Sequence, residues 1–128
     1  MAKHLLDSNI LIGFLRREDR AQAILQALVA SEVPSISVLS IFEVRLGMRS
    51  HEVHGTEQLL RSLEAVPVDE RIAGIAADLG RPALRSGRTI DPIDLHIAAT
   101  CLALDFTLVT YNIKDFRFPG LALYPIPK

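Results

Sequence analysis

The order of hydrophobic and polar positions predicts a chain of short strands that alternate with helices. The most apolar helix follows Asp91, a natural N-cap, and Pro92, which suits the first helical position because its missing N–H is not needed there. Within residues 95–104 only His96 and Thr100 interrupt the apolar surface. A helix that is apolar on most sides is buried, so we expect this helix to lie inside the domain.

The same patterns predict the other elements. Apolar or β-branched runs predict strands at residues 4–6, 35–36, 65–68, 107–109 and 121–124. Helical spacing predicts helices at residues 9–15, 20–29, 38–49, 56–64 and 70–86, with a break at residues 51–55. Proline positions add that the third strand is an edge strand or ends in a bulge, at Pro67, and that the last of these helices is kinked at Pro82. N-caps are expected at Asp19, Ser37 and Asp69.

Strands that alternate with helices predict an α/β architecture. We expect a single domain over residues 1–128, with helices on both faces of a mostly parallel sheet. The sheet is expected to have about four to five short strands.

Composition narrows the class of protein. Apolar residues make up 49% of the chain, which indicates a folded globular protein rather than a disordered one. No apolar run reaches the roughly 18 residues of a membrane span, and the first residues lack the long apolar segment of a signal peptide. Cys101 is the only cysteine and is expected to be a core residue. We therefore expect a cytoplasmic protein without membrane association.

The charge pattern gives only a weak indication of nucleic-acid binding. The net charge is -1, which excludes a generic basic nucleic-acid binder. The cations are mostly arginine, which suits phosphate recognition better than lysine does. They form two clusters, Arg16, Arg17 and Arg20 in one and Arg81, Arg85 and Arg88 in the other. Each arginine taken singly is interpreted as part of a solvated helix face.

Four acidic residues fall close to the predicted ends of strands or inside apolar helices. Asp7 directly follows the first strand, and Asp115 follows the fourth. Asp94 lies in the first turn of the buried helix, and Glu43 lies among apolar residues of the helix at 38–49. Sites in parallel α/β sheets lie beyond the carboxyl ends of the strands, so we expect these four side chains to converge there.

Ordinary structural roles explain some of these acids but not all. Asp7 is able to cap the following helix, although the two residues after it are able to cap it equally well. Asp91 is interpreted as a cap. Asp94 would be stabilised by the free N–H groups and the helix dipole even without another role. Glu43 has no ion-pair partner in its own helix, because Arg45 lies at the wrong spacing.

Clustered carboxylates repel one another, which raises their pKa values or attracts a cation. Oxygen ligands select hard divalent ions, so Mg²⁺ is expected, with Mn²⁺ able to substitute for it. No spacing of Cys and His suggests zinc. A Mg²⁺ site held by acids binds phosphate oxygens, polarises phosphorus and activates a water molecule. The sequence therefore predicts metal-dependent phosphoryl chemistry.

Four segments resemble the PIN-domain family, most closely the VapC-type toxins of toxin–antitoxin pairs. They are residues 5–9 (LLDSN), 37–47 (SVLSIFEVRLG), 94–99 (DLHIAA) and 108–116 (LVTYNIKDF). The resemblance spans the whole chain, and the order and spacing of the acids agree with it.

The resemblance implies a PIN-like domain and a role for each acid. Asp7 and Asp94 would be the main Mg²⁺ ligands. Glu43 would be a further ligand or would orient the water, and Asp115 would be a second-metal or water-mediated ligand. His96 stands where the family usually has an aliphatic residue, and we interpret it as a packing or rim residue. Residues that would shape the site are Ser8, Asn9, Thr110 and Asn112.

The implied activity is that of an endoribonuclease toxin. A metal-activated water would attack the RNA phosphodiester and leave a 5′-phosphate and a 3′-hydroxyl. Family members commonly cut tRNA or ribosomal RNA, form homodimers and are neutralised by a VapB-like antitoxin, which inserts its tail among the acids, sometimes within a higher toxin–antitoxin assembly. Candidate RNA phosphate contacts are Arg16, Arg17, Arg85 and Arg88.

Three other functions are compatible with parts of the sequence. A signalling receiver domain would use Asp69 as phosphoacceptor and Lys114 as its lysine, but a second acid beside Asp7 is absent. A metal-free ribonuclease would need two histidines together, and nothing in the sequence brings two together. A catalytically inactive PIN-fold binding module would keep the fold, although such a module has no need of four acids.

Overall fold

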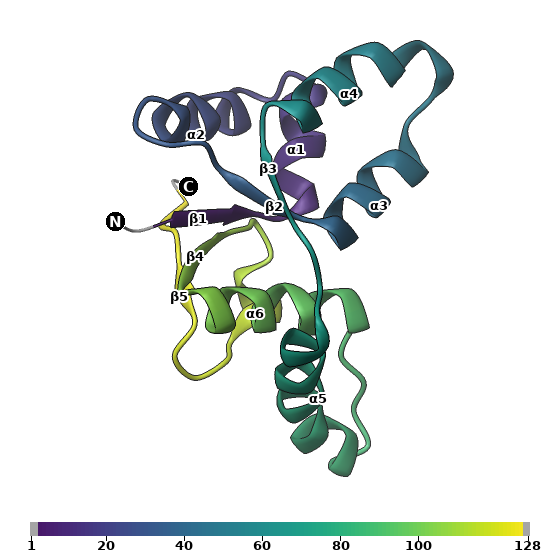
Figure 1. Cartoon of the computed structure of the whole chain (residues 1–128), viewed down its shortest axis with the longest axis vertical. Helices are drawn as coiled ribbons and strands as arrows, with labels where there is room; N and C mark the ends of the chain where they lie inside the picture. The colour runs from purple at the N-terminus through teal and green to yellow at the C-terminus, as the bar shows by residue number, and fades with distance from the viewer. Residues whose placement is uncertain (1–2, 127–128) are drawn as a thin grey trace.

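The computed structural model describes residues 3–126 of the chain. Its centre is a five-stranded sheet in which every pairing is parallel, and the strands follow the order β3-β2-β1-β4-β5 (Figure 1). The predicted α/β architecture with a mostly parallel sheet is therefore confirmed. The strands are β1 (Lys3–Leu6), β2 (Ser35–Ser37), β3 (Glu64–Val66), β4 (Phe106–Val109) and β5 (Ala122–Leu123).

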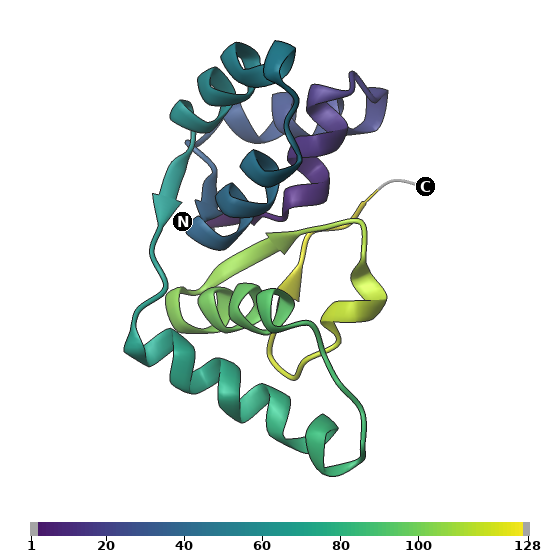
Figure 2. The ribbon, with the colours of Figure 1, turned by 90° about the vertical axis from the view of Figure 1, so that its right-hand side faces the viewer.

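Helices cover both faces of the sheet, as predicted (Figures 1 and 2). One layer holds α1 (Ser8–Leu15), α2 (Asp19–Val29), α3 (Val38–Gly47) and α4 (Val53–Arg61). The other layer holds α5 (Glu70–Arg85) and α6 (Pro92–Leu104). Two short 3-10 helices are η1 (Ser50–Glu52) and η2 (Ile113–Phe116). No helix within residues 3–126 combines the length and the apolar character that crossing a membrane requires.

The central strands divide the hydrophobic core between the two layers. Successive side chains of a strand point to opposite faces of the sheet. In β1, Leu6 belongs to the cluster formed with α1 to α4, whereas Leu5 belongs to the cluster formed with α6. In β4, Val109 and Leu108 are divided in the same way. Cys101 is buried in the α6 cluster, as predicted.

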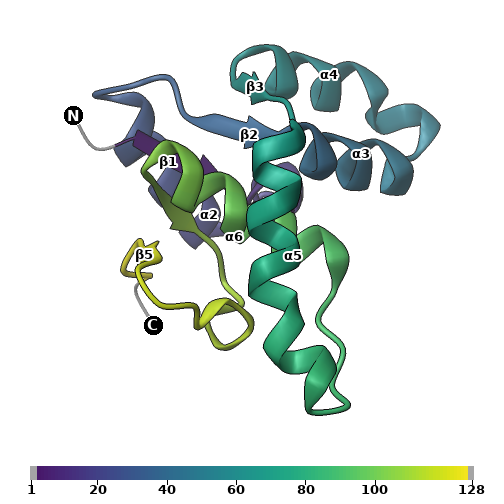
Figure 3. The same cartoon turned by 60° about the horizontal axis from the view of Figure 1, so that its bottom comes forward.

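The α5 and α6 helices pack against each other at close range (Figure 3). A Cβ atom on Gly80 would lie 2.9 Å from Cδ1 of Leu95, so a larger residue there would force the Leu95 side chain to shift. The α5 helix continues through Pro82 to Arg85, and the kink expected there stays a prediction. This packing fixes α6, and with it the position of Asp94 in the first turn of α6.

Several expected boundaries are confirmed and others are wrong. The side chains of Ser37 and Asp69 cap α3 and α5, and Pro67 directly follows the edge strand β3. The break expected at residues 51–55 is instead helical, because η1 and α4 follow each other without a gap and together occupy residues 50–61. The N-cap of α2 is Glu18, and Asp19 is the first helical residue.

The α3 helix is less buried than its apolar sequence indicates. Phe42 is 54% exposed and Leu46 is 73% exposed. Ser40 and Val44 are the buried residues of this helix. One side of α3 therefore meets the core while an apolar stripe on another side faces outward, a distinction that an apolar run without a polar face does not reveal.

Candidate active site

Asp7 lies at the carboxyl end of β1, where the strand passes directly into α1. Its backbone N–H donates to the carbonyl of Val109 at 2.9 Å, which extends the β1–β4 ladder by one residue. Its Oδ1 accepts a hydrogen bond from the backbone N–H of Ser8 at 2.8 Å and so caps α1. The residue is 5% exposed. Burial raises the pKa of the Asp7 carboxyl, and hydrogen bonds from Thr110 and Ser8 offset part of that increase.

Thr110, directly after β4, connects this carboxylate to the neighbouring loop. Its hydroxyl donates to Oδ2 of Asp7 at 2.8 Å. The hydroxyl oxygen of Thr110 in turn accepts hydrogen bonds from the backbone N–H of Asn112 at 3.0 Å and from Nδ2 of Asn9 at 3.3 Å. Oδ1 of Asn9 accepts from the backbone N–H of Tyr111 at 3.5 Å. Thr110 is 1% exposed, so this buried network ties α1 to the segment after β4.

Glu43 is carried by α3 and is joined to the same network through Ser8. The Ser8 hydroxyl donates to Oε1 of Glu43 at 3.0 Å. Burial is the main cause that raises the pKa of Glu43, the Ser8 hydrogen bond lowers it, and the charges of Asp7 and Asp91 raise it. Glu43 has no partner in its own helix, as predicted, because Arg45 pairs with a glutamate of α4.

Asp94 comes to the site in the first turn of α6. Asp91 caps this helix, as expected, with its Oδ1 accepting from the backbone N–H groups of Ile93 at 2.8 Å and of Asp94 at 3.4 Å. The pKa of Asp94 is raised to about 7, and burial is the largest cause. Repulsion by four other carboxylates adds to the increase, those of Asp7, Asp91, Asp115 and Glu43.

The charges of the other three acids predicted from the sequence, Asp7, Glu43 and Asp115, therefore all act on Asp94. From the sequence, Asp91 is interpreted only as a cap. In the structure its charge also raises the pKa values of Asp7, Glu43 and Asp94. The available signal was its position three residues before Asp94, because side chains at this spacing are neighbours on a helix.

An open groove of about 1050 Å³ lies beside the acids and is lined by both Asp94 and Asp115. Its walls come from α5, the α5–α6 loop, the start of α6, and η2 with the residues after it. Three exposed cations, Arg88, Lys114 and Arg117, also line it. Within residues 3–126 none of these three cations makes a salt bridge.

The acids fit a hard divalent cation by the type of their donor atoms. All are carboxylate oxygens, and a cation between them would relieve the repulsion that raises the pKa of Asp94. Among residues 3–126 no three acidic, His or Cys side chains already form a closed metal-binding group. Ligation therefore requires the side chains to rotate. Asp94 and Asp115 are suited to this because, within residues 3–126, their hydrogen bonds are made by backbone N–H groups and none holds a carboxylate.

The residues expected to shape the site differ in what they contribute. The side chains of Ser8, Asn9 and Thr110 all bond within the network. Asn112 contributes its backbone N–H, while its side chain is exposed. His96 lies with its Nδ1 2.6 Å from a carbonyl of its own helix, which agrees with a rim position.

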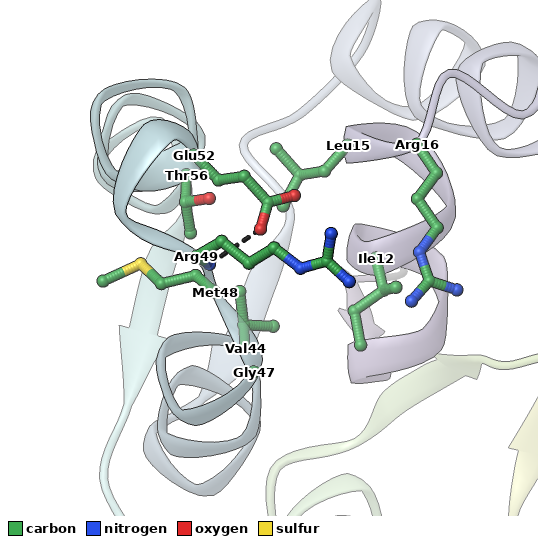
Figure 4. A pocket seen from close by; sticks show the side chains of 9 residues that line it. All are labelled: Ile12, Leu15, Arg16, Val44, Gly47, Met48, Arg49, Glu52 and Thr56. Carbon is green, nitrogen blue, oxygen red and sulfur yellow. Dashed lines mark hydrogen bonds between the residues drawn. The ribbon is translucent and has the colours of Figure 1, made fainter.

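The four arginines expected to contact RNA do not gather in one place. Arg16 lines a separate cavity of about 370 Å³ between α1, α3 and α4, together with Arg49 (Figure 4). Arg17 is exposed in the turn after α1, with a φ of 62°. Arg85 ends α5 and is exposed. Of the four, only Arg88 lines the groove beside the acids.

The site that a receiver domain requires is not assembled. The Asp69 side chain caps α5, and two strands lie between β3 and β4, so Asp69 and Lys114 do not follow neighbouring strands. Of the histidines that a metal-free ribonuclease would use, His4 lies with its Nδ1 2.5 Å from a carboxylate oxygen of Glu32, and His96 bonds within α6.

The fold and the site define a parallel α/β domain with a carboxylate cluster at the carboxyl edge of its sheet. A family model described as "PIN domain" matches residues 4–119. Two Mycobacterium tuberculosis proteins are similar in sequence. "Ribonuclease VapC19" is 35% identical over 119 residues, covering 91% of this chain and 95% of that protein. "Ribonuclease VapC10" is 37% identical over 112 residues, covering 88% and 84%.

A solved structure shows the same fold. It is the crystal structure of VapBC2 from Rickettsia felis bound to a DNA fragment from their promoter, and the matching chain has a TM-score of 0.83 and 26% identity. The match covers 94% of this chain and 96% of that one. The chain therefore belongs to the PIN-domain family.

Proposed function

We propose that this protein is a VapC-type endoribonuclease toxin that hydrolyses RNA with Mg²⁺, or Mn²⁺ in its place, bound among its acids. The observation that carries this proposal is the buried, hydrogen-bonded Asp7, with Glu43 and Asp94 close enough for its charge to raise their pKa values. The names of the two mycobacterial relatives support RNA as the substrate.

Asp7 and Asp94 would hold the cation, with Glu43 as a further ligand or as the residue that orients the water. Asp115 would act on a second cation or through a water molecule. When bound, the divalent cation polarises the scissile phosphate and lowers the pKa of a water molecule that attacks it. The expected products are a 5′-phosphate and a 3′-hydroxyl.

The surrounding residues prepare the acids for this task. The Thr110 hydroxyl holds Oδ2 of Asp7, and the Ser8 hydroxyl holds Oε1 of Glu43, which leaves Oε2 of Glu43 able to accept from a water. Asp94, with a pKa of about 7, shares its carboxylate with a proton near neutral pH. Cation binding at Asp94 is therefore coupled to proton release, because a ligand carboxylate must be ionised.

The RNA target we propose is tRNA or ribosomal RNA, cut at one site. The proposed partners are a cognate VapB-like antitoxin and a second copy of the chain. Support for the antitoxin comes from solved toxin–antitoxin complexes with the same fold, including the Rickettsia felis complex and one from Klebsiella pneumoniae with 28% identity and a TM-score of 0.77. Cations on an antitoxin tail would be attracted by the acids and would compete with Mg²⁺ there.

The decisive experiment incubates the purified protein with total cellular RNA in Mg²⁺, in Mn²⁺ and in EDTA, and maps the cut ends by sequencing. We expect cleavage with either metal, none in EDTA, and 5′-phosphate ends. Asp7→Ala and Asp94→Ala should lower cleavage by about 10²–10³-fold or more, because each removes charge that holds the cation.

Asp105→Asn is the matched control for these variants. Asp105 ends α6 at the opposite end from Asp94 and has a φ of 57°, a conformation that Asn adopts readily. It should cut like the parent protein. Equal cutting by the parent, Asp7→Ala and Asp94→Ala would refute the site, and cutting that survives EDTA would refute the metal. Absence of cleavage under every condition would favour an inactive binding module.

A further inference from the structure

We propose that the groove beside Asp94 and Asp115 binds single-stranded RNA on one side of the scissile phosphate. Arg88, Lys114 and Arg117 would contact the flanking phosphates there. This inference rests on the proposed function, since it takes the acids as the place where the strand is cut, and it adds the path of the substrate and the residues that hold it.

The groove meets the acids on one side, because Asp91, Asp94 and Asp115 line it whereas Asp7 and Glu43 do not. A cation bound among the acids would receive the scissile phosphate there. The same lining holds Arg88 from the α5–α6 loop, and Lys114 and Arg117 from η2 and the residue after it, two segments that can be followed in Figure 2. Cationic side chains neutralise successive phosphates and release their counterions, which supplies most of the affinity for nucleic-acid backbones.

These cations are available, whereas other charges near them are already engaged. Asp78, also in the groove lining, pairs with Arg81 at 2.8 Å. Asp91 uses a carboxylate oxygen to cap α6. Within the described residues 3–126, no carboxylate forms a salt bridge with the three groove cations. Exposed arginine and lysine side chains without partners are suited to bind a phosphate from outside.

The rest of the lining suits nucleobases. Apolar groups of Leu79, Pro82, Ile90 and Phe118 border the same groove, and Phe118 is partly exposed. Aromatic side chains stack on bases of any sequence, because every base has a π-face. The volume of about 1050 Å³ lies at the upper end of the roughly 300–1,000 Å³ typical of ligand pockets.

The test measures RNA binding separately from cleavage. The variant R88Q/K114Q/R117Q is made in an Asp94→Asn background and kept in EDTA, so that the RNA is not cut. The probe is a fluorescein-labelled single-stranded RNA of mixed sequence, and its anisotropy is titrated at several salt concentrations. We expect about tenfold or greater weakening at low salt, and the slope of log affinity against log salt should fall in magnitude by about 2, as for three lost single-strand contacts.

The matched control removes three cations at the other end of the molecule. K3Q/R61Q/R71Q changes the net charge equally, and all three residues are exposed. Lys3 begins β1, Arg61 precedes β3, and Arg71 contacts the carbonyl of Ala103 near the end of α6. The control should keep the affinity and the salt slope of the background. Equal losses in the two triple variants would mean that net charge alone matters, and would overturn the proposal.

A second measurement tests the one-sided path. After the cut site has been mapped, RNA oligonucleotides carry neutral methylphosphonates on either the 5′ or the 3′ side of it. Neutralisation on one side should reproduce the loss seen with R88Q/K114Q/R117Q and should add nothing to that variant. Neutralisation on the other side should weaken both proteins alike, and additive effects on both sides would count against the groove.

The outcomes also separate this inference from the proposed function. If the protein cuts RNA but the groove variant binds and cuts like the control, only the groove is refuted. If the groove variant weakens binding but the parent protein never cuts, the nuclease assignment is refuted and the groove stands. Failure of the Asp94→Asn background itself to bind the probe counts against the groove. A variant that loses antitoxin affinity but keeps RNA affinity would identify the groove as a protein-binding surface instead.

Discussion

The two halves of the acid cluster are held in different ways. On the strand side, Asp7 and Glu43 accept hydrogen bonds from the hydroxyls of Thr110 and Ser8. On the groove side, the carboxylates of Asp94 and Asp115 have no such donors within residues 3–126. Asp94 is also more exposed than Asp7. The strand side is fixed before anything binds, while the groove side is free to adjust.

This difference would suit the metal-dependent nuclease that we propose. A fixed carboxylate sets where a cation sits, because its rotamer is already determined by its hydrogen bonds. An unfixed carboxylate at the groove is able to move as a cation and a strand arrive. Hydrogen bonds also lower the pKa of Asp7, whereas Asp94 lacks that effect and has a pKa of about 7.

The largest effect is expected on the strand side, for Thr110→Val. The change keeps the shape of the side chain but removes the donor to Asp7 and the acceptor for two N–H groups. Because the hydrogen bond to a buried carboxylate is lost, the free energy of unfolding should fall by about 2–3 kcal/mol, as measured by urea denaturation. Thr56→Val is the matched control. Thr56 is equally buried and its hydroxyl bonds to nothing within the described residues, so its change removes an unsatisfied polar group and should leave the free energy of unfolding unchanged or raise it.

Metal binding should act through the groove side. Mg²⁺ at about 100 times its dissociation constant should raise the free energy of unfolding by about 2.7 kcal/mol, because it binds only the folded protein. Asp94→Asn should abolish this increase, and Asp105→Asn should retain it. Thermal unfolding followed by circular dichroism with and without Mg²⁺ provides the measurement. An unchanged response in Asp94→Asn would show that Asp94 is not a ligand.

A smaller effect is expected for Ser8→Ala. This change releases Oε1 of Glu43 but keeps the hydrogen bond from the backbone N–H of residue 8 to Oδ1 of Asp7. Loss of a residue that orients a ligand typically lowers metal affinity or activity about 10–100-fold. Asn112→Ala is the control, because Asn112 contributes only its backbone N–H. We expect its free energy of unfolding to stay within about 0.5 kcal/mol of that of the parent protein. Cleavage rates over a Mg²⁺ titration distinguish the two. Equal cleavage rates for Ser8→Ala and the parent would show that Glu43 does not depend on the hydrogen bond from Ser8.

The smallest effect is the pH dependence of the metal-free protein. The pKa of Asp94, about 7, lies above the ordinary 3.8, so between these values the folded state holds a proton that the unfolded chain has lost. The free energy of unfolding therefore falls as pH rises through this window, and the penalty is complete above pH 7. Because Asp94 is partly exposed, solvent screening limits the penalty to about 1 kcal/mol.

Asp94→Asn should remove that penalty. In EDTA the variant should be more stable than the parent at pH 8 and equally stable near pH 4, as judged by urea denaturation at each pH. A parent protein whose stability relative to the variant does not change between these pH values would contradict the raised pKa.

Much of the fold could be predicted because its signals are local. Asp91 and Pro92 predict the start of α6, and Asp7 lies where β1 ends and α1 begins. The convergence of Asp7, Glu43 and Asp94 followed from a general rule about parallel sheets, since every strand delivers its carboxyl end to one edge. The metal roles of these acids remain predictions.

What could not be predicted depends on contacts between distant segments. Lys114 and Arg117 lie in and after a short 3-10 helix without hydrophobic periodicity, and they become neighbours of Arg88 only because η2 and the α5–α6 loop border one groove. The exposure of Phe42 and Leu46 likewise depends on which neighbours α3 has, and not on its own composition.

The bond from the backbone N–H of Asp7 to the carbonyl of Val109 makes this acid the last rung of the central strand pair. A slip of β1 against β4 by one residue would exchange the two faces of the strand and carry the carboxylate away from Thr110. Through Asp7, the proposed site is thus anchored in the sheet and not in a detachable loop. The nuclease activity that we propose should accordingly be lost when the sheet unfolds.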